Sequence, residues 1–310
     1  MNRWTLLLLL AIGCLVPSCK RDEAGAVGAA PAAKPRVVAA EGLAKIWGAE
    51  PVSDLEVAEF IERLDTVARL RTGLDRGEVK LLLSQLGAGK PACLSTGMWH
   101  HFFNSACNAL AATEGLDATA IAPMLFAVLA EDRDKVMRLY ALQHLGNLHP
   151  GAPEPVRSQI GRRVLELAGS AADDAVAGTA MDLLERWQGQ LGAEVEPASA
   201  EVRAKMAVAT MLDQRRATDV RSSAVHMAVD GGFREALPAA RQIAADPQED
   251  VLLRKASIHL IGQLGVESDS ALLSRCAEEN LRLAQAADPA RIALSDRLAV
   301  RAGPTLTPYE

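Results

Sequence analysis

A segment of eleven residues recurs along the chain, and this internal repeat limits the possible architectures more than any other feature. Its four copies, which align without gaps, are Val136–Gly146, Ala175–Glu185, Asp219–Val229 and Leu252–Gly262. Their third residues are separated by 39, 44 and 33 positions. A repeat at this spacing indicates a series of similar structural units that stabilise one another through contacts between neighbours.

The pattern of apolar residues indicates that these units are helical. From residue 41 onward, apolar residues recur at helical spacing between Gly, Pro and Asp breaks, without sustained alternation of β-branched residues. Thirteen short helices are expected, and the last two cover Ser270–Leu283 and Pro289–Ala302. Because aromatic residues make up only 4% of the chain, the core must be aliphatic. We therefore predict an all-α fold, an α-solenoid of about six to seven helical hairpins rather than a closed bundle.

One repeat has a recognisable form. Glu235–Pro247 followed by Glu249–Gly262 resembles a HEAT repeat, with a proline-bent helix, an Asp-rich turn and a second helix that carries an arginine near its start. The resemblance is good over Ala118–Gly146 and Phe233–Gly265, and fair over Ala198–Val229. It implies a right-handed stack of helical hairpins whose second helices line a concave, protein- or peptide-binding face. Such repeats also occur in some bilin lyases, so the fold alone does not exclude an enzyme.

Two aspartates stand at the start of second helices. Asp134 and Asp250 lie four residues before Arg138 and Arg254, at a spacing that allows ion pairing along a helix. An aspartate near a helix N-terminus also interacts favourably with the helix dipole. We expect these arginines to form Asp–Arg pairs that continue from repeat to repeat.

The N-terminus has the organisation of an export signal. Arg3 is followed by the apolar run Thr5–Val16, which is too short to span a bilayer. The residues Val16–Cys19 resemble the lipobox of bacterial lipoproteins, and this resemblance implies cleavage before Cys19 and attachment of lipid to it. Cys14 is a competing match to the same motif, and an ordinary secretory signal is the other alternative.

These features divide the chain into three parts. Residues 1–18 are expected to be a signal peptide, residues 19–40 the lipidated cysteine and an Ala/Pro/Gly-rich tether, and residues 41–310 the HEAT-like domain. Lys20 follows the expected lipidation site. By analogy with the enterobacterial sorting rule, this residue favours the outer membrane, with the protein facing the periplasm.

The aligned second helices share one polar position. It is occupied by Gln143, Asp182, His226 and His259, and it falls between apolar neighbours on each helix. Equivalent positions of packed helices lie about 10 Å apart. Since a zinc–nitrogen bond is only about 2.1 Å long, we predict the polar lining of a binding groove and no metal site.

Three basic residues lie near this position. Arg221, Arg254 and Lys255 would add positive charge beside the groove, which suits an acidic peptide or a carboxylate. The alternative for the two arginines is a structural role in the Asp–Arg pairs described above.

An aromatic cluster and two cysteines fall in the first third of the domain. His100 and His101 follow Trp99, but adjacent residues on a helix point about 100° apart, so we expect core or capping roles rather than a shared metal ion. Cys93 and Cys107 could form a disulfide that pins a loop to the following helix, with two buried thiols as the alternative.

Several function classes are disfavoured. The formal net charge is −6 and the pI is about 5.6, so binding to a nucleic-acid backbone would lack its electrostatic driving force. The sequence contains no phosphate-binding loop, nucleophile elbow, paired-histidine metal motif or Cys-x-x-Cys pair, and it indicates no catalytic residue and no cofactor. We expect a membrane-anchored envelope protein that serves as a scaffold for a protein or peptide partner. The alternatives are a lyase-type enzyme on the same fold and a purely structural envelope lipoprotein.

Overall fold

The computed structural model describes residues 43–48, 52–130, 133–170, 173–191 and 198–302. In this part of the chain, regular structure consists of thirteen α-helices and short 3₁₀ turns, without a β-strand. The prediction of an all-α fold is therefore confirmed. Cys14, Cys19 and the expected signal peptide and tether lie outside the described residues.

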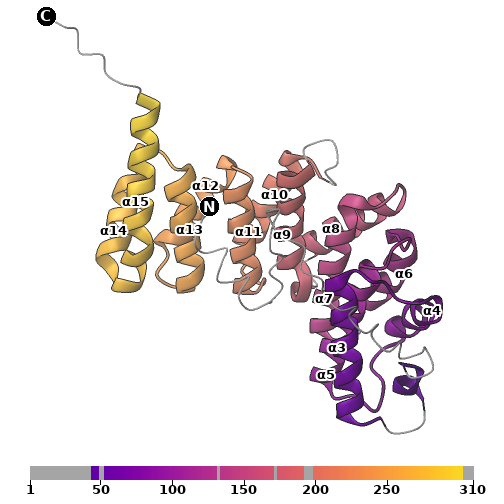
Figure 1. Ribbon diagram of the computed structural model, residues 1–310. Helices are drawn as coiled ribbons and strands as arrows, with labels where there is room; N and C mark the ends of the chain where they lie inside the picture. The colour runs from indigo at the N-terminus through magenta and orange to yellow at the C-terminus, as the bar shows by residue number, and fades with distance from the viewer. Residues whose placement is uncertain (1–42, 49–51, 131–132, 171–172, 192–197, 303–310) are drawn as a thin grey trace, which may run out of the picture. The chain divides into compact units, whose positions relative to one another are not determined.

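The helices follow one another with short connections (Figure 1). Their bounds are α3 Asp54–Leu70, α4 Arg76–Gln85, α5 Thr96–Ala111, α6 Ala118–Val128, α7 Lys135–Leu148, α8 Val156–Gly169, α9 Asp174–Leu191, α10 Ala200–Leu212, α11 Thr218–Asp230, α12 Leu237–Ala245, α13 Val251–Leu264, α14 Ser270–Glu279 and α15 Leu281–Ala302. Eleven of these helices match the expected ones closely, and the two at the C-terminal end differ.

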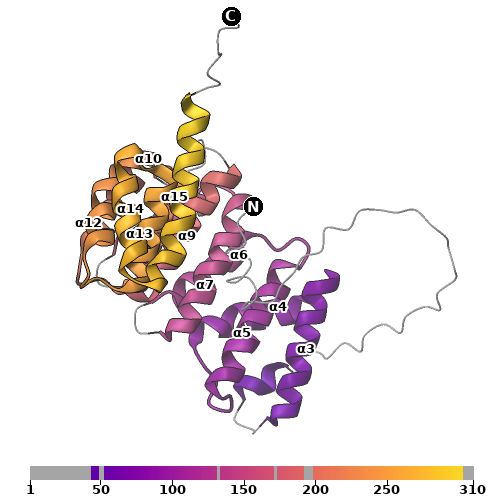
Figure 2. The same ribbon diagram turned by 90° about the vertical axis from the view of Figure 1, so that its left-hand side faces the viewer.

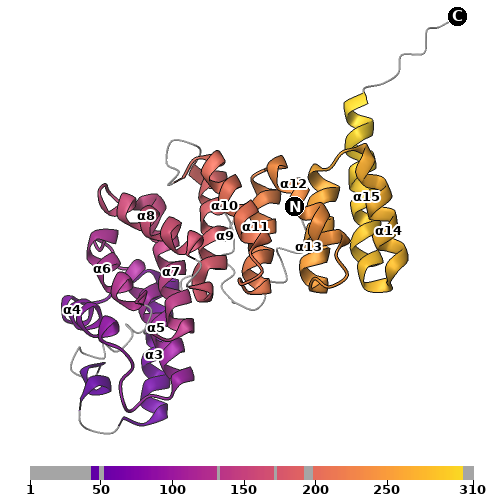
Figure 3. The same cartoon turned by 180° about the vertical axis from the view of Figure 1, so that it is seen from behind.

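Contacts arrange the helices in pairs and in rows (Figures 1 to 3). The pairs α6–α7, α8–α9, α10–α11, α12–α13 and α14–α15 each pack together. The second helices of these pairs also contact one another in order, from α7 through α9, α11 and α13 to α15, and α5 extends the series by its contact with α7. We call this series the second-helix row. The aligned segments of the sequence therefore lie on adjacent helices.

The last two helices differ from the expectation. α14 ends at Glu279, and α15 begins immediately after Asn280, whose side-chain Oδ1 accepts a hydrogen bond of 3.0 Å from the backbone N–H of Leu283. Pro289 lies inside α15 instead of at its start. The helix continues through this proline because an apolar stripe on both sides of it, which includes Leu283 and Leu294, is buried against α13 and α14.

The two aspartates cap their helices and do not pair with the arginines that follow. Asp134 Oδ1 accepts backbone N–H groups of α7 at 2.9 and 3.2 Å, and Asp250 Oδ1 accepts those of α13 at 2.7 and 3.4 Å. The expected pairs of Asp134 with Arg138 and of Asp250 with Arg254 were therefore wrong. A carboxylate that already satisfies the free N–H groups of the first helical turn points away from a side chain one turn later.

Each of these arginines instead joins its own repeat to the next one. Arg138 on α7 pairs with Asp173, directly before α9. The corresponding partner of Arg221 is Glu249, before α13, and that of Arg254 is Glu279, before α15. A further donor of Arg221 and of Arg254 bonds to a main-chain carbonyl ten residues earlier, at the end of the preceding helix. Each arginine of this ladder thus bridges consecutive hairpins.

A glycine allows one pair of second helices to approach closely. A Cβ atom on Gly262 of α13 would lie 2.7 Å from both Cα and Cβ of Ala290 on α15. Since backbone cannot yield as a flexible side chain can, Gly262→Ala is expected to lower the free energy of unfolding by about 1–3 kcal/mol in urea titrations. The control is Gly97→Ala on α5, where a Cβ would contact nothing within 4 Å, and no loss of stability is expected. Equal stability of both variants would contradict the close approach.

Candidate functional site

The polar position predicted from the repeat lies on the second-helix row. Gln143 is on α7, Asp182 on α9, His226 on α11 and His259 on α13. Asp182 and His226 are exposed, and Gln143 and His259 are half-buried. These four helices contact one another in order, so the four residues lie at equivalent positions of adjacent helices, and we call them the first polar column.

A second polar column accompanies the first and was not predicted from the sequence. Its members, each four residues after a member of the first column, are Asn147, Arg186, Asp230 and Gln263. Residues four apart share one face of a helix, so this spacing alone could have identified them. Arg186 donates a hydrogen bond of 3.3 Å to Asn147 Oδ1 across the α7–α9 contact. We call the eight residues of the two columns the polar face.

Carboxylates from two helices interact on the polar face. Although Asp182 is exposed on one side, burial by the surrounding helices, together with the negative charge of Asp230, raises the pKa of its carboxyl group to about 6. Arg186 opposes this rise. Asp182 therefore lies near enough to a like charge on α11 for its ionisation to be disfavoured.

The histidines of the polar face interact in a similar way. Burial lowers the pKa of His259, and the positive charge of protonated His226 lowers it further, whereas Asp230 acts in the opposite direction. The four titratable groups Asp182, His226, Asp230 and His259 thus form one electrostatically coupled cluster on α9, α11 and α13. In the described part of the chain, no group of three or more His, Cys, Asp or Glu residues is arranged to hold a metal ion.

Two of the residues expected at a groove have another role. Arg221 and Arg254 are only 6% and 4% exposed, and their guanidinium groups are engaged in the ion pairs between repeats. The expectation that they provide positive charge for an acidic ligand is thereby corrected, because a buried and paired guanidinium cannot reach a partner. Lys255 is half-buried on α13, one turn before His259.

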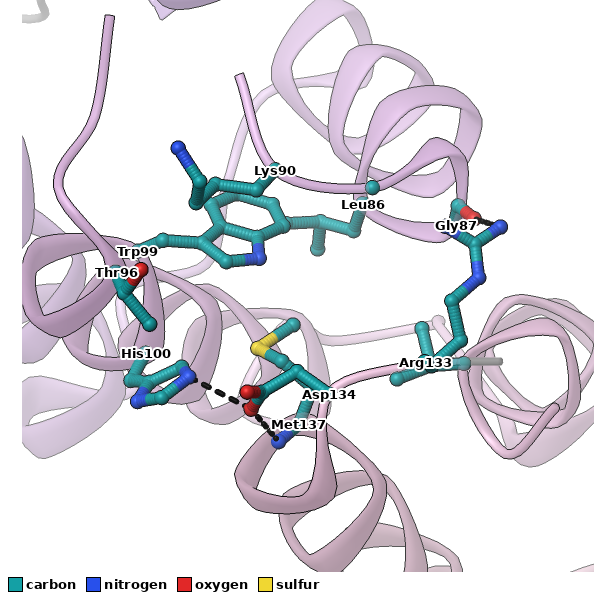
Figure 4. A pocket seen from close by; sticks show the side chains of 11 residues that line it. Leu86, Gly87, Lys90, Thr96, Trp99, His100, Arg133, Asp134 and Met137 are labelled. Atoms are coloured by element: carbon teal, nitrogen blue, oxygen red, sulfur yellow. Dashed lines mark hydrogen bonds and ion pairs between the residues drawn. The ribbon is translucent and has the colours of Figure 1, made fainter. Parts of the chain in front are cut away.

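A pocket lies elsewhere, lined by residues 86–90 after α4, by α5, by the end of α6 and by the start of α7 (Figure 4). It has a volume of about 270 Å³ and is lined by Trp99, His100, Arg133 and Asp134, among others. His100 Nε2 lies 2.8 Å from Asp134 Oδ1. This pair joins α5 to the start of α7.

The three aromatic residues of α5 have the expected core role, whereas the exposed His101 has neither a core nor a capping role. Trp99 is buried against Phe102 and Phe103, with ring centroids 6.0 Å apart in both pairs. His101 lies on another side of the helix, with Nε2 3.8 Å from Asp65 of α3. His100 and His101 therefore contact different helices.

The disulfide expected between Cys93 and Cys107 is not formed. Both residues are free thiols, as is Cys276. Cys93 Sγ donates a hydrogen bond of 3.1 Å to the carbonyl oxygen of Ile46, and Cys107 is buried in the core of α5, where burial raises the pKa of its thiol. The alternative of two buried thiols holds for Cys107, whereas Cys93 is only half-buried.

The chain was compared with protein families, curated proteins and solved structures. No protein-family model, curated protein or solved structure matches the chain. None of the helices in the described residues combines the length and apolar composition needed to cross a bilayer.

Proposed function

We propose that this chain is a lipid-anchored, HEAT-like α-solenoid of the bacterial cell envelope that binds a segment of a protein partner on its polar face. The pairing of helices and the ordered contacts of the second-helix row support the solenoid arrangement. The resemblance of Val16–Cys19 to a lipobox supports the anchor, which places Cys19 at the membrane and the helical domain beyond a tether.

One observation carries the proposal of binding. The two columns of polar residues lie on adjacent helices, and within the part of the chain that the structure describes their four titratable groups make no ion pair that would consolidate the fold. Other charged groups of these repeats, such as Arg138, Arg221 and Arg254, form ion pairs between hairpins. Polar residues that are aligned on adjacent helices and are not committed to ion pairs are typical of a surface that binds another molecule.

The test is chemical cross-linking of the full chain, tagged at its C-terminus, in cells that produce it. The tested variant carries Asp182→Lys and His226→Ala, which alter the centre of the polar face. The matched control carries Glu59→Lys and His101→Ala, which change one exposed acid and one exposed histidine on α3 and α5. Circular dichroism confirms that both variants remain helical.

We expect one cross-linked partner to be recovered with the unaltered chain and with the control, and to be reduced at least tenfold with the tested variant. Equal recovery by all three chains would contradict binding on the polar face. Loss with the control as well would locate the partner elsewhere on the domain.

A further inference from the structure

The pocket shown in Figure 4 contains a hydrogen-bond donor that has no acceptor. Trp99 lines this pocket and is only 2% exposed, and within the described part of the chain its indole N–H donates no hydrogen bond. The nitrogen lies on the side of the ring that faces Asp134 and Met137, where a molecule in the pocket can reach it. A ligand that displaces water from this N–H must supply an acceptor in its place.

A lysine adds positive charge to the same pocket. Lys90 Nζ donates hydrogen bonds to two main-chain oxygens, that of Leu94 at 2.7 Å and that of Pro91 at 3.4 Å. Among the described residues, Lys90 forms no ion pair. An ammonium group has three N–H donors, so the third one is available to a ligand. The two carbonyl groups hold the cation in place and leave its charge unpaired.

Two helices begin beside the pocket. Thr96 is the first residue of α5, which has 16 residues, and Asp134 is the N-cap of α7, which has 14. The N-terminal end of a helix carries a partial positive charge and favours an anion. Asp134 is already engaged, because its Oδ1 accepts two N–H groups of α7 and lies 2.8 Å from His100 Nε2. The donors around the pocket therefore outnumber the acceptors that remain for a ligand.

The other walls of the pocket are apolar, and the space between them is small. Leu86, Val128 and Met137 are all buried. The volume of about 270 Å³ is slightly below the roughly 300 Å³ at which pockets for drug-sized molecules begin. These dimensions suit a single ring or a short branched chain.

We propose that this pocket binds a small carboxylic acid in its ionised form, with a single ring or a short branched chain as its apolar part. The carboxylate accepts hydrogen bonds from the indole N–H of Trp99 and from Lys90, and the apolar part contacts Leu86, Val128 and Met137. None of these residues belongs to the polar face, so the proposal is independent of the binding function proposed above.

A carboxylate fits the pocket better than the other small polar groups. An ammonium group has no acceptor for the indole N–H and would be repelled by Lys90 and by the ends of the two helices. A neutral amide offers an acceptor, but its hydrogen bonds are weaker than the charge-assisted ones that a carboxylate forms. The expected order of affinity is therefore carboxylate, amide, ammonium.

The test is NMR spectroscopy of the full chain in detergent, with isotope-labelled tryptophan so that each indole N–H gives its own signal. Trp99→Phe identifies the Trp99 signal by its loss. Benzoate is the titrated probe, and benzamide and benzylamine carry an amide and an ammonium group in place of the carboxylate. The tested variant is Lys90→Met, and the matched control is Lys80→Met, which changes an exposed lysine of α4 outside this pocket.

We expect benzoate to move the Trp99 signal to lower field and to saturate it, with an affinity about tenfold or more above that of benzamide, and benzylamine to leave the signal in place. Lys90→Met should weaken benzoate about fivefold or more, whereas Lys80→Met should not. A Trp99 signal that benzoate does not move, or equal affinity for either comparison compound, would overturn the proposal. Since all three compounds are compared on the unaltered chain, this outcome does not depend on how a variant folds.

Discussion

Replacing Arg138 by methionine is expected to lower the free energy of unfolding by about 3–5 kcal/mol, the largest effect of any single substitution considered for this chain. The guanidinium group of Arg138 is 4% exposed, and its partner Asp173 is 6% exposed. Two parallel contacts join them, and the one from Nη1 to Oδ1 measures 3.1 Å. Without the arginine, the carboxylate of Asp173 would remain buried and uncompensated between α7 and α9.

The expected loss of stability comes from the unpaired carboxylate of Asp173 and not from the loss of a favourable ion pair. Desolvation of two ions offsets much of their attraction, so a well-packed apolar pair of similar volume can replace a buried ion pair at little cost. The double variant Arg138→Met with Asp173→Leu should therefore recover most of the stability that Arg138→Met loses. Equal losses in the single and the double variant would contradict this account. Urea-induced unfolding followed by circular dichroism provides the measurement.

An exposed ion pair is the appropriate control. Arg163 and Glu166 lie one turn apart on α8, with 3.3 Å between Nη1 and Oε2, and side chains that are 36% and 54% exposed. Solvent screens such a pair, so Arg163→Met is expected to change stability by less than about 0.5 kcal/mol. A loss as large as that for Arg138→Met would mean that removing any arginine weakens the domain.

The arginine ladder also illustrates which features the sequence could reveal. The alignment of repeats identified Arg138, Arg221 and Arg254 as equivalent, because the spacing of the repeats can be read directly from the sequence. Their partners could not be found in this way, since each acid lies 25 to 35 residues further on, in a turn whose position depends on how hairpins stack. The nearer aspartates, Asp134 and Asp250, instead cap their own helices.

The polar face was predictable in part for the same reason. The column from Gln143 to His259 follows from the alignment, and the parallel column that contains Arg186 and Asp230 follows from helical spacing once the first is known. The direction of its charge was not predictable, because it depends on which basic residues are buried. Burial of Arg221 and Arg254 removes the positive charge that the sequence suggested beside this face.

Pro289 marks a different limit. Proline usually ends or begins a helix, so the local signal placed a boundary there. Packing overrides that signal, because α15 buries residues on both sides of the proline against α13 and α14, and the true boundary is the short interruption at Asn280. Tertiary contacts of this kind cannot be read from a single segment.

Mild acid is expected to destabilise the domain through two buried histidines. His144 on α7 is buried, with Nε2 3.1 Å from Asn104 Oδ1, and burial lowers its pKa from 6.5 to about 4. His149 stacks on Trp187, with ring centroids 3.8 Å apart, and burial followed by the charge of Arg157 lowers its pKa to about 4 as well. Both side chains are thus held in the neutral form.

The sign of the pH dependence follows from these values. Between pH 6.5 and pH 4 the unfolded chain binds a proton at each histidine and the folded chain does not, so stability falls as pH decreases. For His144 the loss between pH 7 and pH 5 is about 2 kcal/mol, and His149 adds a loss in the same direction. Asp182 acts oppositely, because its raised pKa lets the folded state take up a proton near pH 6.

Conservative variants separate these contributions. In an Asp182→Asn background, His144→Gln retains a partner for Asn104 and His149→Phe retains the stack on Trp187, while neither new side chain titrates. Urea titrations at pH 7 and pH 5 should give a large difference in stability for the background and a difference reduced by at least half when both histidines are replaced. An undiminished difference would assign the acid sensitivity to other groups. A reduced one would assign it to the end of α7 and its junction with α9, where the two histidines lie.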